Sequence, residues 1–251
     1  YELNQKKTNR IIGGMLWMKM SPLNIKMAID LSGLGLDQIE ETQEEFRIGC
    51  MVTLRQLETH PGLEAYTGGS MKESLRHIVG VQFRNLATVG GSIYGRFGFS
   101  DVLTAFLALD TFVELYDGGT IRLSEFVNRK PDKDILLSVI VRKSKRKFRY
   151  ESIRQTKTDF PVIACSVVTG MVHGKETWYF SVGARPMKAA LLEKQWEIPS
   201  DASEETIAEY ARQAASEFTY GTNMRGSAEY RRHLAEVLIR REMSSILAEG
   251  R

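Results

Sequence analysis

The chain has 251 residues, 43% of them apolar, and its 34 basic and 31 acidic side chains give a formal net charge of +3. This composition is typical of a globular protein with a sizeable core, in one large domain or two modest ones. No uncharged apolar run approaches the ~18 residues that a membrane-spanning helix needs, so we expect no membrane span.

Short strands and a hairpin are predicted at the start of the chain. An apolar strand breaks into glycines over residues 10–14, and a second strand ends in a turn over residues 26–34. Residues 38–50 supply the two arms of a hairpin. The opening residues 1–14 resemble the last turn of a helix whose beginning is absent, so we expect that native N-terminal residues are missing and see no secretory leader.

Helix-capping patterns follow the hairpin. Thr53 and Gln56 have the spacing of a capping box, which predicts a helix that ends at Pro61. Ser70 and Glu73 repeat the pattern ahead of a second helix. These two signals place helices immediately before a glycine-rich stretch.

A buried helix and a hairpin follow the glycine-rich stretch. Residues 100–110 predict the helix, and residues 111–126 predict a hairpin that turns at Asp117 and Gly118. The first 145 residues therefore alternate helices with strands.

From about Leu136 the pattern changes to consecutive strands, which predict an antiparallel meander over residues 136–143, 147–154, 162–172 and 177–184. Two helices follow over residues 203–218 and 227–249, and in the second one the apolar face is expected to carry Tyr230, Leu234, Val237 and Leu238. We therefore place a domain boundary near residue 145, which gives domains of residues 1–145 and 146–251.

Two pairs of adjacent glycines are the most informative local feature. Gly13 and Gly14 follow the first strand, and Gly90 and Gly91 lie in the stretch RNLATVGGSIYG. Glycine reaches a positive φ at little cost, so such loops let several backbone N–H groups converge on one anion, usually phosphate. Each pair taken singly is more typical of a tight turn, and the residues leave both interpretations open.

Several other functional classes find no support. There is no GxxxxGK[ST] or GxGxxG signature and no legible Ser-His-Asp or Cys-His set. The two distant cysteines, Cys50 and Cys165, argue against a disulfide framework, a zinc site or an iron-sulfur cluster, and favour a reducing cytoplasm. The spacing of the four histidines indicates no metal site. The basic run over residues 142–150 is more typical of a solvated strand connection than of a nucleic-acid interface.

The order of motifs resembles the FAD-binding (medium) subunits of molybdenum hydroxylases, a family that includes the flavin domain of xanthine dehydrogenase and the medium subunit of carbon monoxide dehydrogenase. The segments that carry this resemblance are IIGGMLWMKM, FRIGCMVTLRQLETHPGL, VQFRNLATVGGSIYGRFGFSDVLTAFLALD and GSAEYRRHLAEVL. The resemblance implies an α+β protein. Its FAD-binding domain, of the vanillyl-alcohol oxidase-like fold, has two α/β lobes, about residues 1–59 and 60–145, and precedes a C-terminal domain of antiparallel sheet and helices.

The resemblance also implies cofactor-binding residues on both sides of the FAD diphosphate. On one side they are Ile12, Gly13, Gly14, Met15 and Leu16, and on the other Thr88, Gly90, Gly91 and Ser92. Further positions along the cofactor are Gly80, Phe83, Tyr94, Asp101 and Leu137, with Arg154 in the same segment as Leu137. Asp101 would accept hydrogen bonds from FAD hydroxyls, although it could equally cap the helix that it begins.

The implied function is a relay of electrons from iron-sulfur clusters of a small partner subunit through FAD to an acceptor such as NAD, with molybdopterin held by a large subunit. We expect no catalytic residue, no metal site, no nucleic-acid partner and no membrane span. We expect a cytoplasmic location. The sequence departs from the family where Met15, Leu16 and Trp17 replace small hydroxyl residues, and Ser92 stands where asparagine is common. These departures leave open a flavin-free structural or assembly subunit of the same kind of complex. A free-standing flavoenzyme is the third alternative.

Overall fold

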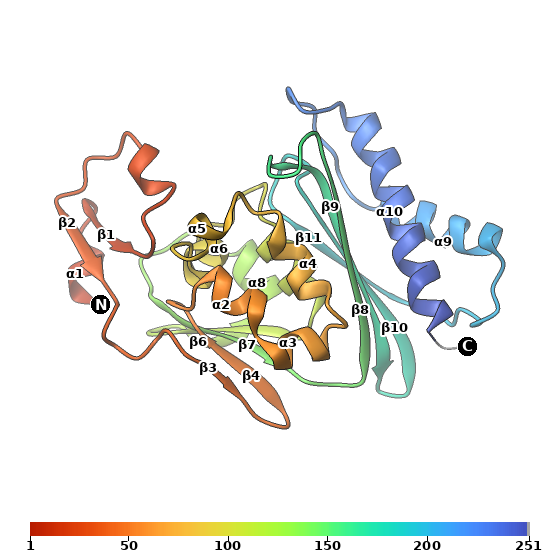
Figure 1. Ribbon diagram of the computed structural model, residues 1–251, viewed down its shortest axis with the longest axis horizontal. Coiled ribbons are helices and arrows are strands. Elements are labelled where there is room, and N and C mark those ends of the chain that lie inside the picture. Colours follow the sequence, from red (N-terminus) through yellow and green to blue (C-terminus); the bar gives the residue numbers. More distant parts are fainter. Residues whose placement is uncertain (250–251) are drawn as a thin grey trace.

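Three β-sheets organise the chain in the computed structural model, which describes residues 1–249 (Figure 1). The N-terminal segment holds helix α1 (Glu2–Gln5), strand β1 (Asn9–Ile12), a short 3-10 helix η1 (Met18–Met20) and strand β2 (Met27–Asp30). Strands β1 and β2 pair in parallel, with Asn9 opposite Met27 and Ile12 opposite Asp30. This segment lies to one side of the remaining structure in Figure 1.

The central sheet is antiparallel and has the strand order β3-β4-β7-β5-β6. Its strands are β3 (Ile39–Glu41), β4 (Glu45–Gly49), β5 (Thr111–Leu115), β6 (Gly119–Arg122) and β7 (Leu136–Arg142). The sequence-based assignment of residues 136–143 to the C-terminal meander is therefore wrong. Strand β7 is buried along most of its length, and it lies between β4 and β5, where both of its edges find partners.

Short helices cover the central sheet. They are α2 (Leu54–Thr59), α3 (Pro61–Tyr66), α4 (Ser70–Arg76), α5 (Val81–Arg84), α6 (Val89–Tyr94), α7 (Asp101–Ala108) and α8 (Leu123–Asn128). The capping box of Thr53 is confirmed, and the hairpin at residues 111–126 is confirmed up to Arg122, after which α8 begins. The expected cap at Ser70 is wrong, because Gly69 at φ 80° precedes α4 and the Ser70 hydroxyl donates to the Phe148 carbonyl instead.

The C-terminal sheet has the order β11-β10-β9-β8 and is antiparallel throughout. Its strands are β8 (Arg146–Arg154), β9 (Pro161–Val172), β10 (Lys175–Gly183) and β11 (Ala190–Gln195), the last of which has no counterpart among the predicted elements. His173 and Gly174, both at positive φ, make the predicted turn between β9 and β10. Helices α9 (Glu204–Ser216) and α10 (Ala228–Ala248) cover one face of this sheet.

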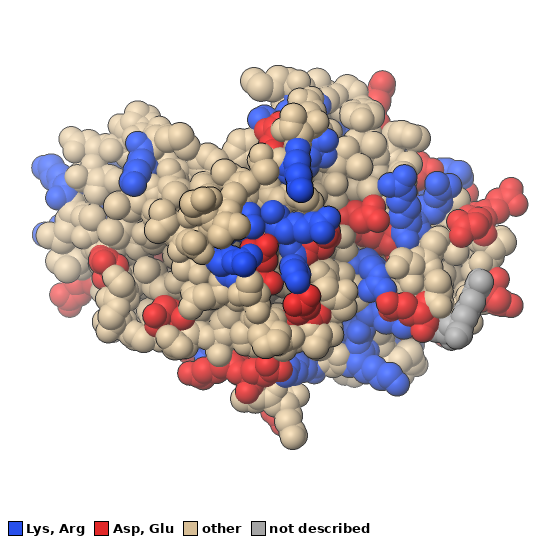
Figure 2. Space-filling model, in the orientation of Figure 1, with Lys and Arg blue, Asp and Glu red and all other residues tan. Residues whose placement is uncertain are grey.

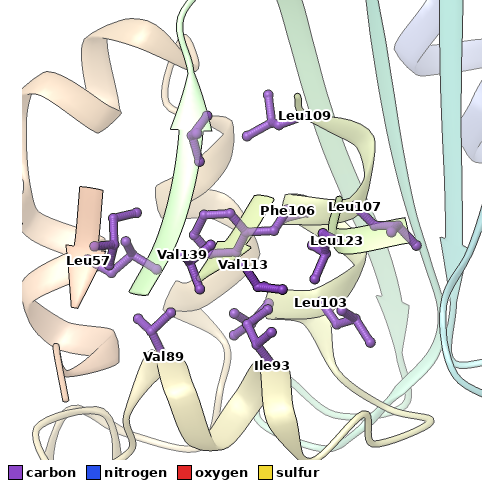
Figure 3. Close-up of a cluster of buried hydrophobic side chains, with 14 of the residues drawn as sticks. Leu57, Val89, Ile93, Leu103, Phe106, Leu107, Leu109, Val113, Leu123 and Val139 are labelled. Carbon is purple, nitrogen blue, oxygen red and sulfur yellow. The ribbon is translucent and has the colours of Figure 1, made fainter. Parts of the chain in front are cut away.

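Two hydrophobic cores follow from this layering. In the first, side chains of α6 and α7 such as Ile93 and Phe106 pack onto Val113 and Val139 of the central sheet (Figure 3). The second lies between the C-terminal sheet and α9 and α10, around Trp178. The predicted apolar face of α10 is only partly correct: Leu238 is buried, but Tyr230 is 48% exposed, and the buried side chains are Arg231, Ala235, Leu238, Ile239, Glu242, Met243, Ile246 and Leu247.

Two structural absences can be stated for residues 1–249. No helix in that range is long and apolar enough to cross a lipid bilayer. No group of three or more His, Cys, Asp or Glu side chains among those residues is arranged to hold a metal ion.

Candidate functional site

A cavity of about 680 Å³ opens where the N-terminal segment, the region from α4 to α7 and the loop between β8 and β9 come together. In Figure 2 the surface is notched between the N-terminal segment and the tip where β8 meets β9. The cavity lies within the size range of cofactor-binding clefts. Predicted site residues that line it are Ile12, Gly13, Gly14, Met15, Leu16, Phe83, Thr88, Gly90, Gly91, Ser92, Tyr94 and Asp101.

The first glycine pair packs against the segment that leads into the second pair, although the two pairs are far apart in the sequence. A Cβ atom added to Gly13 would lie 2.6 Å from the Thr88 hydroxyl oxygen, and one added to Gly14 would lie 1.9 Å from the Leu86 carbonyl oxygen. Both distances are shorter than van der Waals contact. The first loop therefore needs glycine because the Thr88 side chain passes against Gly13 and the backbone of Leu86 and Ala87 passes against Gly14.

The first loop also presents unused hydrogen-bond donors. Within residues 1–249, the backbone N–H groups of Gly14, Met15 and Leu16 donate to no protein acceptor. Met15 has a left-handed φ of 55°, whereas Gly13 and Gly14 do not. The expectation that positive φ explains these glycines is therefore wrong, and the turn in the backbone falls on Met15. Consecutive N–H groups around such a turn form a concavity that binds anions.

The second loop contributes differently. The Gly90 N–H donates to the Cys50 carbonyl at 2.8 Å, and the Gly91 N–H donates to the Thr88 hydroxyl oxygen at 3.2 Å. Both amides thus have acceptors inside the protein and are not available to a phosphate in this geometry. The Thr88 hydroxyl, which accepts from Gly91, keeps its own proton to donate. Gly90 is required by close packing, since a Cβ there would lie 2.6 Å from the Cys50 carbonyl oxygen.

Asp101 is the first residue of α7 and is 4% exposed. It does not cap the helix, because the Ser100 side chain accepts from the Leu103 N–H in that position. Instead Asp101 Oδ1 accepts from Arg154 Nη2 at 2.6 Å and from the Tyr150 hydroxyl. Burial raises the pKa of Asp101, while the Arg154 guanidinium and the Tyr150 hydroxyl act to lower it.

An aromatic cluster forms one wall of the cavity. The Trp17 ring centroid lies 5.7 Å from that of Phe83, 5.5 Å from Phe99 and 5.4 Å from Phe160. Phe160 belongs to the loop between β8 and β9, so this cluster joins the N-terminal segment to the C-terminal sheet. Sequence reasoning identified Trp17 as bulky but missed its partners, because no local pattern links rings 66 to 143 residues apart.

The remaining predicted residues divide into those that line the cavity and those that do not. Tyr94 lines it, donates from its hydroxyl to the Asp132 carbonyl at 2.8 Å, and packs its ring 5.9 Å from Phe126. Burial, followed by the charge of Asp132, raises the pKa of Tyr94 to about 12. Gly80 and Leu137 do not line the cavity. Gly80 has an ordinary extended φ of −150° before α5, and the β7 residue that reaches the cavity is Leu136.

A buried ion pair, which the sequence did not reveal, positions the second loop. Arg84 donates to Glu58 at 2.8 and 3.2 Å and to the Ile78 carbonyl at 3.0 Å, and both charged side chains are about 5% exposed. This pair joins α5 to α2 and so fixes the backbone that enters Thr88. Arg231 is a packing residue: its buried guanidinium donates to the carbonyls of Val162, Gly221 and Gly226.

The basic run at residues 142–150 is occupied with intramolecular contacts. The Arg142 guanidinium lies 4.2 Å from the Phe112 ring centroid, and that of Arg146 lies 4.8 Å from Tyr179. Lys143 pairs with Glu41 at 2.7 Å, and Arg149 pairs with Glu249. These contacts favour the interpretation of this run as a structured surface.

A turn with three free amides, a close-packed glycine pair and a largely apolar cavity are typical of the nucleotide-cofactor-binding class of proteins. The residues present fit a dinucleotide, because residues 14–16, whose amides are free, line one cavity together with the aromatic cluster and Asp101.

The chain belongs to the family described as the FAD binding domain in molybdopterin dehydrogenase, whose model matches residues 3–143. Residues 148–246 match the CO dehydrogenase flavoprotein C-terminal domain. This confirms the resemblance drawn from the sequence. FAD is the cofactor of this family, whose members are oxidoreductases.

Two curated proteins illustrate the relationship. The chain is 25% identical over 214 residues to the uncharacterized protein YgfM of Escherichia coli K12, covering 85% of this chain and 78% of YgfM. It is 24% identical over 255 residues to the nicotine 6-hydroxylase medium subunit of Paenarthrobacter nicotinovorans, covering 95% of this chain and 90% of that subunit.

Solved structures share the fold. Quinoline 2-oxidoreductase from Pseudomonas putida 86 matches with a TM-score of 0.83 and 17% identity, over 99% of this chain and 92% of that one. Carbon monoxide dehydrogenase from Hydrogenophaga pseudoflava, in a form that lacks the Mo-pyranopterin moiety, matches with a TM-score of 0.80 and 18% identity, over 97% and 91%. These likenesses confirm the expected α+β fold with its C-terminal sheet domain.

Proposed function

We propose that this chain is the FAD-binding subunit of a molybdopterin-dependent hydroxylase or dehydrogenase complex. In such a complex, iron-sulfur clusters in a small partner subunit would deliver electrons, a large subunit would hold molybdopterin, and an acceptor such as NAD would take the electrons up. FAD supplies the redox chemistry, because flavins exchange electrons both singly and in pairs. The observation that carries the proposal is the meeting of the two glycine loops at one cavity within a chain of this family.

The residues of this chain would bind and orient the cofactor rather than perform chemistry. The free N–H groups of Gly14, Met15 and Leu16 are placed to donate to the diphosphate, with the Thr88 hydroxyl as a donor from the facing loop. Side-chain hydroxyls are absent from the first loop, so backbone amides carry this contact. Asp101 would accept from a hydroxyl of the cofactor through its Oδ2 atom, because Tyr150 and Arg154 both donate to Oδ1.

The wall formed by Trp17, Phe83, Phe99 and Phe160 would give a planar ring an apolar surface and exclude water from it. Tyr94 lines another part of the cavity, and its raised pKa keeps the hydroxyl protonated at neutral pH. The site supports cofactor binding without an acid-base pair, which agrees with the lack of a legible catalytic set in the sequence.

The proposal is tested by producing the chain in a host that makes flavins, together with the genes that neighbour its own. The purified chain should carry close to one FAD per molecule, measured from the flavin spectrum after denaturation. Co-purified polypeptides should contain iron and molybdenum, and substrate reduction of the complex should bleach the flavin band.

A colourless chain that also fails to take up added FAD would refute FAD binding and favour the flavin-free structural subunit, for which the bulky Trp17 cluster is the supporting observation. A chain that turns over substrate without partners would instead support a free-standing flavoenzyme.

A further inference from the structure

Asp101 depends on residues from the other part of the chain. It begins α7, which packs between the central sheet and the C-terminal sheet, and both donors to its Oδ1 atom come from β8 of the C-terminal sheet. Tyr150 is 3% exposed, and the Arg154 side chain is 7% exposed. A buried contact therefore joins the two sheets at the wall of the cavity.

Arg154 holds a second element of that wall. Its Nη1 atom donates to the Asp159 carbonyl at 2.6 Å while Nη2 contacts Asp101. Asp159 and its neighbour Phe160 line the cavity, and the Asp159 carboxylate pairs with Arg225 at 3.2 Å. One guanidinium thus fixes both the Asp101 carboxylate and the loop between β8 and β9.

Opposing effects act on the pKa of Asp101, which is raised overall. Burial raises its pKa, and Arg154 and Tyr150 are the groups that act against this. His77 is a further titratable group that lines the cavity, and its charged form is disfavoured by the nearby charges of Arg154 and Lys157. Removal of the guanidinium would leave a buried carboxyl group without its main counter-charge, so it would retain its proton to a higher pH.

We propose that Arg154 and Tyr150 are positioning residues for FAD binding, which keep Asp101 ionised and oriented so that Oδ2 accepts a hydrogen bond from a cofactor hydroxyl. This inference rests on the FAD-binding role proposed above. It assigns to the C-terminal domain a part in cofactor affinity that acts through Asp101. An ionised acceptor gives the stronger hydrogen bond, so cofactor affinity depends on the charge that these two donors maintain.

The test is FAD affinity as a function of pH. Flavin is removed from the purified chain, and FAD is titrated back between pH 5.5 and 8.5 while flavin fluorescence is followed. The wild type should bind with little pH dependence. At the acid end of this range, Arg154→Gln should bind FAD about 10- to 100-fold more weakly than the wild type, which is the effect expected from the loss of one charge-assisted hydrogen bond. Its affinity should rise with pH as Asp101 ionises.

Four further variants separate positioning from general damage. Asp101→Asn should bind weakly at every pH, and Arg154→Gln should add little to it in the double variant. Arg154→Lys should restore most of the wild-type pH profile, since it returns a positive charge. Arg225→Gln is the matched control, because it removes an arginine that also contacts Asp159 of the loop between β8 and β9 but does not touch Asp101, and it should keep a flat profile.

Two results would overturn the inference: an Arg154→Gln profile that matches Arg225→Gln, or a loss that is uniform with pH and additive to that of Asp101→Asn. If Arg154→Gln fails to fold, Tyr150→Phe decides the matter, because it keeps the ring and removes one donor to Asp101. It should shift the profile in the same direction, and an unchanged profile would count against the proposal. A wild-type chain that binds no FAD would refute the proposed function instead.

Discussion

Replacement of Gly14 by alanine provides the sharpest test of the site. The added Cβ would lie 1.9 Å from the Leu86 carbonyl oxygen and 2.5 Å from the Leu86 carbonyl carbon, so the two backbones must separate. Neither atom belongs to a flexible side chain that could move away. Separation would turn the amides of residues 14–16 away from their shared target. The loss of two hydrogen bonds to a charged group costs about 3–6 kcal/mol, which corresponds to roughly a hundred- to ten-thousand-fold weaker FAD binding.

The assay compares Gly14→Ala with Gly80→Ala by isothermal titration with FAD. Gly80 is a suitable control, because a Cβ there has its nearest neighbour at 3.5 Å, its φ is ordinary, and it does not line the cavity. Both variants should keep wild-type secondary structure by circular dichroism. If Gly14→Ala binds FAD within threefold of the wild type, the first loop does not hold the diphosphate and the assignment fails.

Three further changes test other parts of the structure. Arg84→Met should lower the free energy of unfolding by about 1.5–3 kcal/mol, because Glu58 loses its buried partner and keeps only the partly exposed Arg55 as a counter-charge, and a loss below 1 kcal/mol in urea titration would contradict this. Trp17→Phe should still bind FAD. Addition of FAD should lower the tryptophan emission of the wild type more than that of Trp17→Phe, and equal quenching in the two proteins would place Trp17 away from the cofactor. Burial, and then the charge of Glu151, raises the pKa of Glu242, so its proton is retained in the folded state and lost in the unfolded state above the ordinary Glu pKa. Stability should fall by up to about 1.4 kcal/mol per pH unit as pH rises from that value, and Glu242→Gln should abolish this slope in urea titrations from pH 4.5 to 7.5.

Local signals in the sequence predicted much of the fold. The Thr53 capping box, the turn at His173 and Gly174, and the buried helix at residues 101–108 each depend on residues a few positions apart. Such features are decided by side-chain hydrogen bonds to nearby amides, by backbone preference and by the spacing of apolar residues. Ser70 shows the limit of this reasoning, since its hydroxyl found a better acceptor in Phe148, 78 residues away.

Strand partners could not be predicted in the same way. Residues 136–142 read equally well as the first strand of the C-terminal meander or as a member of the central sheet, because a continuous apolar run satisfies both. Residues 136–142 join the central sheet because β7 pairs with β4 along one edge and with β5 along the other. Neighbouring side chains in a strand point to opposite faces, so an error of one position assigns the wrong residue to the cavity. For this reason Leu137 was predicted, whereas Leu136 lines the cavity.

The candidate site depends almost entirely on contacts that are distant in the sequence. The glycines could be found because both loops carry an unusual composition, but their physical role was partly misjudged: the amides of Gly90 and Gly91 serve Cys50 and Thr88, and the free donors belong to the first loop. Asp101 could be found from a family pattern, whereas its partners on β8 follow no pattern of spacing. The candidate site combines the first glycine loop, Asp101 at the start of α7 and its two donors on β8. Its geometry is therefore determined by how these three segments pack together. Substitutions at Tyr150 and Arg154 in the C-terminal sheet should therefore weaken cofactor affinity, although both residues lie outside the glycine loops.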